Sequence, residues 1–313
     1  MIFFQILFYL LSFLILWYCS GIIIQSVDRF AHRLKLSSFT VSFFVLGVLT
    51  SIPEFSVGIN SIIDKTPDVF VGNLIGASLI LFILVIPILA VFGNGVKMIH
   101  QMTDKDMIFA LLVAGAPIFL IADNLLTRTE GVFLIIIYII LFYFIEKKKG
   151  LMEVVKNNKI FKEKGLLDGW LELILAIIIT FLVSRFIVEQ TVYFANYFKV
   201  SSFLISIVFL SLGTNIPEIS LAIKSIMMNK KEIALGDYLG SAAANTLIFG
   251  VLTLLNGARI NVTNYSLRTL IITLFGLGAF YLFSQSKNEI SKKEGKILLL
   301  IYVLFIITQV LFP

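Results

Sequence analysis

The sequence "LTSIPEFS", residues 49–56, places a proline and a glutamate in the middle of an apolar run. That run, residues 40–63, is long enough to cross a bilayer, because about 20 apolar residues span ~30 Å of hydrocarbon. Pro53 interrupts helical hydrogen bonding, and Glu54 brings an ionisable carboxylate into the hydrocarbon. Both are costly in mid-span, so the stretch indicates a site rather than a plain membrane helix.

A second stretch, "GTNIPEIS" at residues 213–220, has the same combination in Pro217 and Glu218. Residues 35–62 and 199–226, which lie 164 positions apart, align without a gap and share 14 identities in 28 positions. Apolar composition does not explain the match, because the shared residues are largely polar or proline. The chain is therefore predicted to contain a duplication.

The composition predicts a helical membrane protein. The chain of 313 residues is 59% hydrophobic and 14% charged, with a mean hydropathy of +1.01. A soluble domain needs more polar cover, and the sequence does not alternate as a transmembrane barrel would. Ten membrane-spanning helices are expected, at residues 3–25, 37–62, 69–93, 106–124, 130–146, 168–189, 201–227, 232–256, 265–284 and 294–312.

The basic residues predict the orientation. With the N-terminus outside, 19 of the 25 Lys and Arg residues fall on inner links or inner span ends, as the positive-inside rule requires. The even number of spans then puts the C-terminus outside as well. The expected location is a cell membrane, and the net charge of +6 is read as an orientation signal rather than as a sign of nucleic-acid binding.

The expected domains are a first five-helix repeat at residues 1–146 and a second at 168–313, joined by a basic cytoplasmic linker at 147–167. Their duplicated cores are residues 37–93 and 201–257. Because five spans separate the two copies, the copies face opposite ways in the membrane. Inverted repeats with broken helices are typical of secondary transporters.

The two breaks supply oxygen atoms. Each proline leaves the carbonyl four residues earlier, of Leu49 or Gly213, without its usual donor, and a carboxylate follows directly. Such groups are tolerated in a membrane where they line a cavity or bind something. Hard cations such as calcium take six to eight oxygen ligands. The chemistry indicates a cation site in the middle of the membrane.

At these residues the chain resembles the calcium/cation antiporter superfamily. "LTSIPEFS" and "GTNIPEIS" are similar to its two repeat motifs, and closer to those of the sodium/calcium exchangers than to those of the proton/calcium exchangers. The resemblance implies a membrane protein that is not an enzyme and has no cofactor. It implies calcium as one substrate, sodium or protons as the other, and one chain as the working unit.

The resemblance also implies the ligands by motif position. They are the carboxylates of Glu54 and Glu218, the carbonyls of Thr50 and Thr214, and, at flanking cation sites, the side chains of Ser51, Asn215, Ser241 and Asn245 with the carbonyls of Gly47 and Ser211. Asp237, opposite Asn73 in the repeat, is a third candidate carboxylate. It either touches the cation path or caps the following half-helix.

The first repeat departs from the family pattern. Ser241 corresponds to Ala77 and Asn245 to Leu81, where the family usually has polar side chains. Ser78 is one residue away from Ala77 and is expected to point ~100° away from it on a helix. At least one flanking sodium site is therefore expected to be lost or weakened. That leaves fewer sodium ions per cycle, protons as the counter-ion, or a different divalent cation.

Two other classes of function stay open on the residues alone. A passive cation channel could use the same glutamates as a filter, although channels usually repeat around an axis normal to the membrane. An intramembrane enzyme would need a nucleophile with a base, or a metal cluster, and a glutamate pair alone is weak support for one. A flux that saturates and depends on a counter-ion separates exchange from a channel.

Overall fold

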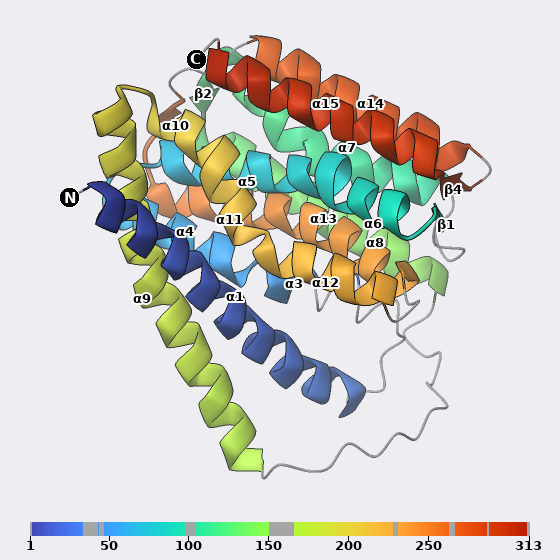
Figure 1. The fold of residues 1–313 in the computed structure, drawn as a ribbon, viewed down its shortest axis with the longest axis horizontal. Coiled ribbons are helices and arrows are strands. Elements are labelled where there is room, and N and C mark those ends of the chain that lie inside the picture. Colours follow the sequence, from blue (N-terminus) through green and yellow to red (C-terminus); the bar gives the residue numbers. More distant parts are fainter. Residues whose placement is uncertain are drawn as a thin grey trace.

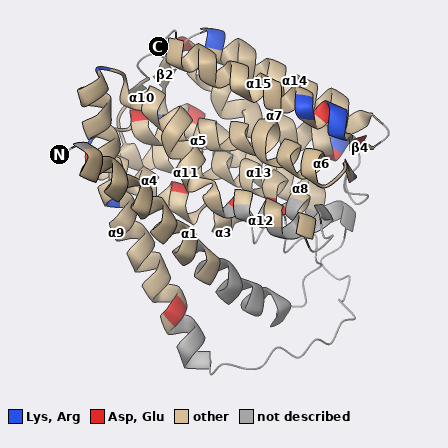
Figure 2. Ribbon diagram, in the orientation of Figure 1, with Lys and Arg blue, Asp and Glu red and all other residues tan. Residues whose placement is uncertain are grey.

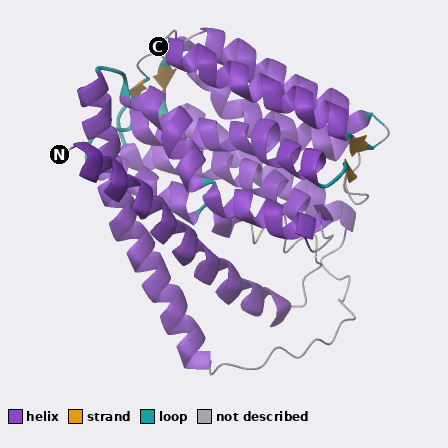
Figure 3. Ribbon diagram, in the orientation of Figure 1, coloured by secondary structure: helices purple, strands orange, loops and turns teal. Residues whose placement is uncertain are grey.

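The fold of the computed structural model is a bundle of helices (Figure 1). The structure describes residues 2–33, 43, 47–97, 104–149, 166–227, 231–262, 267–286 and 288–311. Nearly all of them are helical, and the few strand residues lie at the ends of the bundle (Figure 3). The predicted linker falls largely outside the described residues, so the domain division stays a prediction.

Eight of the ten crossing segments are helices without a central break. They are α1 (Ile2–Arg33), α5 (Asp68–Ile80) with the π-helix η2 (Leu81–Val85) and α6 (Ile86–Phe92), α7 (Asp104–Leu120) with the 3-10 turn η3 (Ile121–Asp123), α8 (Arg128–Lys149), α9 (Leu166–Phe198), α13 (Lys231–Asn256), α14 (Leu267–Gln285) and α15 (Lys292–Leu311).

The other two segments are the broken helices that the sequence predicts. The first consists of α3 (Gly47–Thr50) and α4 (Ile52–Ile63). The second consists of α10 (Ser202–Ile205), the π-helix η4 (Ser206–Leu210), α11 (Ser211–Thr214) and α12 (Ile216–Met227). The prediction of an all-helical membrane protein with ten spans is thus confirmed.

Two predicted helix ends are wrong, because α1 and α9 both run further than their apolar stretches. Helix α9 continues past residue 189 to Phe198. Its polar residues near the predicted end do not stop it, since Arg185 and Glu189 pair along the helix, with Nε and Oε1 3.2 Å apart. A charge pair four residues apart supports a helix instead of ending it.

The centre of the bundle is formed by α5, η2 and α13, in which most described residues are buried. The outer helices α1, α8, α9, α14 and α15 instead expose Leu, Ile, Val and Phe side chains, the surface expected against lipid. Lys and Arg gather near the two ends of the bundle, away from its middle (Figure 2). Seven described helices are long and apolar enough to cross a membrane, and three shorter apolar helices complete the ten.

Two short antiparallel ladders mark the inversion of the repeats. Strand β1 (Val96–Lys97) pairs with β4 (Glu289–Ile290), and β2 (Leu125–Leu126) pairs with β3 (Ile260–Asn261). The repeat offset of 164 converts β1 into β3 and β2 into β4, so it converts one ladder into the other. The ladders lie at opposite ends of the bundle (Figure 1). Equivalent segments of the repeats therefore face opposite ends.

The turns that follow β2 and β4 repeat each other in detail. The Glu130 carboxylate accepts from the Thr127 amide at 2.7 Å, and the Glu294 carboxylate accepts from the Ser291 amide at 2.8 Å. Both are capping boxes, which satisfy amides that the first turn of a helix leaves free. The same local chemistry thus starts α8 and α15.

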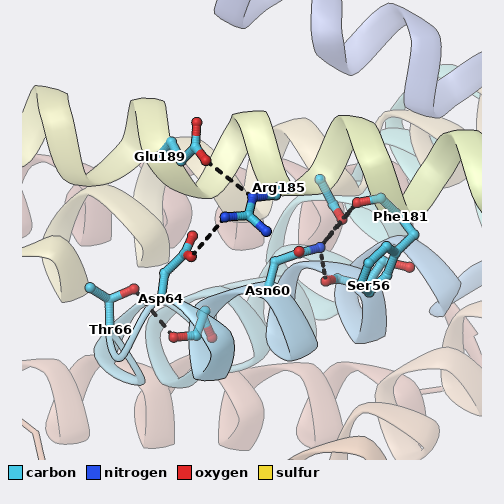
Figure 4. Close-up of polar contacts among 9 residues, drawn as sticks. Ser56, Asn60, Asp64, Thr66, Phe181, Arg185 and Glu189 are labelled. Atoms are coloured by element: carbon cyan, nitrogen blue, oxygen red, sulfur yellow. Dashed lines mark hydrogen bonds and ion pairs between the residues drawn. The ribbon is translucent and has the colours of Figure 1, made fainter.

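A polar contact links α4 with α9 (Figure 4). The buried Asn60 amide donates to the carbonyl of Phe181 at 3.0 Å and to Ser184 Oγ at 2.8 Å. One turn further, Arg185 lies 3.7 Å from the Asp64 carboxylate. These contacts fix the second half of the first broken helix against the long first helix of the other repeat.

Glycines bring the broken helices close to α5 and α13. A Cβ on Gly76 would collide with the carbonyl oxygen of Ile207, and one on Gly240 would collide with that of Phe43. These two contacts are equivalent at the offset of 164. Close helix packing by small residues is common in membranes. Each broken helix therefore packs against the central helix of the opposite repeat.

We expect Gly76→Ala to lower the melting temperature of the detergent-solubilised protein by several degrees, because the added methyl group must push two backbones apart at a cost of about 1–3 kcal/mol. Gly278→Ala is the matched control, since a Cβ at the exposed Gly278 of α14 meets nothing within 4 Å. Equal melting temperatures for the two variants would contradict the close approach.

Candidate cation-binding site

Each broken helix presents a glutamate at the start of its second half. Ser51 separates α3 from α4, and Asn215 separates α11 from α12, with similar backbone angles (φ −84° and ψ 8°, φ −89° and ψ 11°). Pro53 falls in the first turn of α4, where a helix needs no amide donor. The proline thus defines where the second half begins and sets Glu54 in its first turn.

The two glutamates are buried within the bundle. Glu54 is 2% exposed and Glu218 is 1% exposed, and Oε2 of each has no hydrogen-bond partner among the described residues. The Glu218 carboxylate lies close enough to those of Glu54 and Asp237 to be repelled by both. Three acidic side chains from α4, α12 and α13 thus gather in one buried region.

Asp237 is fully buried, and neither of its carboxylate oxygens has a partner within the described part of the chain. No three acidic, histidine or cysteine side chains among the described residues form a compact metal centre. A cation held here would therefore take most of its oxygens from hydroxyl, amide and backbone groups around one or two carboxylates.

The carbonyls of Gly47 and Ser211 are engaged by side chains. Ser51 Oγ donates to the carbonyl of Gly47 at 2.9 Å, and Asn215 Nδ2 donates to that of Ser211 at 2.8 Å. The hydroxyls of Thr50 and Thr214 also lie 3.3 Å from these two carbonyls. A cation that used these carbonyls would have to displace hydrogen bonds, a condition that the sequence did not indicate.

Hydroxyl groups connect the first break with α13. Thr50 Oγ1 lies 2.9 Å from Ser241 Oγ, and Ser51 Oγ lies 3.2 Å from the same atom. All three residues are buried. The structure therefore brings together the predicted Thr50, Ser51 and Ser241.

The second break is connected with α5 in another way. The Thr214 hydroxyl donates to Asn73 Oδ1 at 3.3 Å and lies against the Glu54 carboxylate. Asn73 is fully buried, and its own Nδ2 has no partner among the described residues. Asn73 corresponds to Asp237, so the repeats place an amide and a carboxylate at equivalent positions.

Sequence reasoning missed Tyr238. Its buried hydroxyl donates to the backbone carbonyl of Glu218 at 3.1 Å and so fixes the start of α12 against α13. The equivalent residue in the first repeat is Leu74, so only one glutamate has this support. A tyrosine inside the glycine-rich "GDYLGS" was the available signal, because a buried phenol needs a hydrogen-bond partner.

The comparison with known families identifies this arrangement. The model of the family described as "Sodium/calcium exchanger protein" matches residues 4–146 and 169–311. The chain belongs to this family. It is therefore a multi-pass membrane protein of a cation antiporter family and not an enzyme.

Relatives of the chain are similar along most of their length. The inner membrane protein YrbG of Escherichia coli is 24% identical over 276 residues, which cover 82% of this chain and 85% of the relative. The sodium/calcium exchanger MaX1 of Methanosarcina acetivorans is 22% identical over 333 residues, which cover 92% and 93%.

Two solved structures have the same fold. The sodium-calcium exchanger NCX_Mj superposes with a TM-score of 0.67 at 23% identity, over 98% of this chain and 99% of that one. The H+/Ca2+ exchanger CAX superposes with a TM-score of 0.76 at 17% identity, over 99% and 82%. The fold is thus shared by exchangers with different counter-ions and does not choose between them.

We expect Tyr238→Phe to weaken binding of a divalent cation by about fivefold, because losing one buried hydrogen bond costs about 1 kcal/mol. The measurement is the rise in melting temperature with added calcium. Tyr302→Phe on α15, a buried tyrosine that stacks on Phe305, is the control. An unchanged calcium response in Tyr238→Phe would show that Glu218 needs no such support.

Proposed function

We propose that the chain is a secondary antiporter that exchanges calcium for sodium by alternating access around Glu54 and Glu218. The observation that carries the proposal is the pair of equivalent helix breaks, each with a buried carboxylate oxygen that has no partner among the described residues. An unpaired carboxylate is costly in a membrane, and a bound cation removes that cost.

The oxygen chemistry favours a hard cation. Carboxylate, hydroxyl, amide and carbonyl oxygens suit calcium and other hard ions rather than soft metals. On this proposal, Glu54 and Glu218 are the principal calcium ligands, with the carbonyls of Thr50 and Thr214. The flanking ligands are the side chains of Ser51, Asn215, Ser241, Asn245 and Asp237, with the carbonyls of Gly47 and Ser211.

One chain supplies both halves of this site, so we propose that it works as a monomer. The proposed orientation has both termini outside, because it leaves most basic residues on inner links. Sodium is favoured as the counter-ion because hydroxyl and amide side chains line both breaks. Protons are the alternative, since Ala77 and Leu81 provide no side-chain oxygen.

We expect Glu54→Gln and Glu218→Gln each to abolish calcium transport while leaving the protein folded. The carboxamide keeps the shape but loses the charge that offsets dehydration of the ion. The measurement is uptake of radioactive calcium into sodium-loaded proteoliposomes. Glu189→Gln on the exposed side of α9 is the control and should transport normally. Normal calcium uptake in either site variant would contradict the assignment of Glu54 and Glu218 as calcium ligands.

The counter-ion can be decided by changing one gradient at a time. We expect calcium flux under a sodium gradient at fixed pH, and little flux under a pH gradient without sodium. The reverse result would replace sodium by protons and keep the two glutamates as the calcium site. Calcium flux that does not saturate and that depends on neither counter-ion would support a passive channel instead.

A further inference from the structure

The side chain of Ser78 lies where the first repeat was expected to lack a polar group. Asn245 Nδ2 donates to Ser78 Oγ at 3.4 Å, across the interface between α5 and α13. Ser78 is 6% exposed and Asn245 is 3% exposed. Ser78 points away from Ala77, but it is three residues before Leu81, the other first-repeat position that lacks a polar side chain. Residues three apart are neighbours on a helix, so Ser78 can supply a polar group there.

The hydroxyl of Ser78 has a different kind of partner from the hydroxyls of Ser211 and Ser284. The hydroxyls of Ser211 and Ser284 donate to backbone carbonyls one turn earlier, at 2.7 Å in both cases. Among the described residues, the recorded partner of Ser78 is a side chain on the opposite repeat. A hydroxyl oxygen has two lone pairs, so accepting from Asn245 leaves one for a further ligand.

Asn245 supplies a second free oxygen. Its Oδ1 is buried and has no hydrogen-bond partner within the described part of the chain. Buried polar atoms are normally paired, so an orphan beside another available oxygen points to a ligand that completes the pair. The two oxygens come from helices of different repeats.

The pair adjoins the proposed calcium site through the α13 helix. On α13, Asn245 is four residues after Ser241, so the two lie on one helix face, and Ser241 contacts Thr50 and Ser51. Ser78, which accepts from Asn245, therefore lies near the first break.

We propose that Ser78 replaces the missing ligand of the first repeat and that its Oγ, with Oδ1 of Asn245, binds a monovalent cation of the sodium class. This inference rests on the proposed exchange function. Both oxygens are uncharged, and the affinity of an oxygen site for calcium depends on the number of charged ligands. A neutral pair therefore suits an ion that is less costly to dehydrate than calcium.

The test is sodium binding to the purified protein, titrated by calorimetry with sodium chloride against choline chloride. Ser78→Ala is expected to raise the sodium dissociation constant about tenfold and to change that of calcium by less than about twofold. Asn245→Ala should raise the sodium dissociation constant to a similar extent, and the double variant should bind sodium no more weakly than either single one, because the two residues act as one unit. Ser78→Thr, which keeps the hydroxyl, should restore sodium binding.

Ser284→Ala is the matched control, because it removes a buried hydroxyl whose partner among the described residues is a carbonyl of the same helix, α14. Unchanged sodium binding in Ser78→Ala, or equal losses for sodium and calcium, would overturn the inference. Absence of sodium binding in the unaltered protein would overturn it too. A different result would contradict the proposed function itself: the absence of calcium exchange by the unaltered protein in proteoliposomes.

Discussion

The rest of the structure depends on two carboxylates held in the membrane interior without an ion pair to Lys or Arg among the described residues. Such groups are costly in hydrocarbon, and the protein reduces the cost in two ways. Each glutamate occupies the first turn of a half-helix, where the partial positive charge of a helix N-terminus favours an anion. Hydroxyl and amide groups then surround the breaks. What remains is a deficit of positive charge, which a transported cation is suited to fill.

The sequence predicted the ten spans and the duplication well, because both depend on signals that tertiary contacts do not override. Span length follows from bilayer thickness, and polar identities at a fixed offset expose the repeat. The sequence predicted helix ends less well, since α9 continues past Arg185 and Glu189, which stabilise it. The side-chain contacts of the site could not be predicted. Whether Ser78 reaches Asn245 depends on how closely α5 and α13 approach each other, and a single sequence does not contain that distance.

The two repeats share their backbone features and differ in a few side chains near the site. The breaks, the capping boxes, the strand ladders and the contacts of Gly76 and Gly240 with backbone carbonyls all recur at the offset of 164. Apart from Ser51/Asn215 and Gly47/Ser211 at the breaks, the differences that bear on the site lie along α5, η2 and α13, in the pairs Asn73/Asp237, Leu74/Tyr238, Ala77/Ser241 and Leu81/Asn245. The backbone must keep its symmetry if the bundle is to open toward either side in the same way. Ligand side chains carry no such requirement, because one ion is shared by both repeats. Ion selectivity can therefore change on these two helix faces without disturbing the fold.

The count of charges links this asymmetry to the proposed counter-ion. On the proposed cycle, ionised Glu54 and Glu218 together balance one calcium ion, and the Asp237 carboxyl is a third acidic group that acts on Glu218. An uncompensated charge in a buried site is strongly unfavourable. On the proposed cycle, the calcium-bound state therefore needs one monovalent cation or one proton in addition to calcium. In the first repeat the equivalent of Asp237 is the neutral Asn73, so this requirement arises from the second repeat alone. The neutral oxygens of Ser78 and Asn245 offer a place for a monovalent ion on the same pair of helices, which is why the side chains of α5 and α13, rather than the two glutamates, are expected to set the ion stoichiometry.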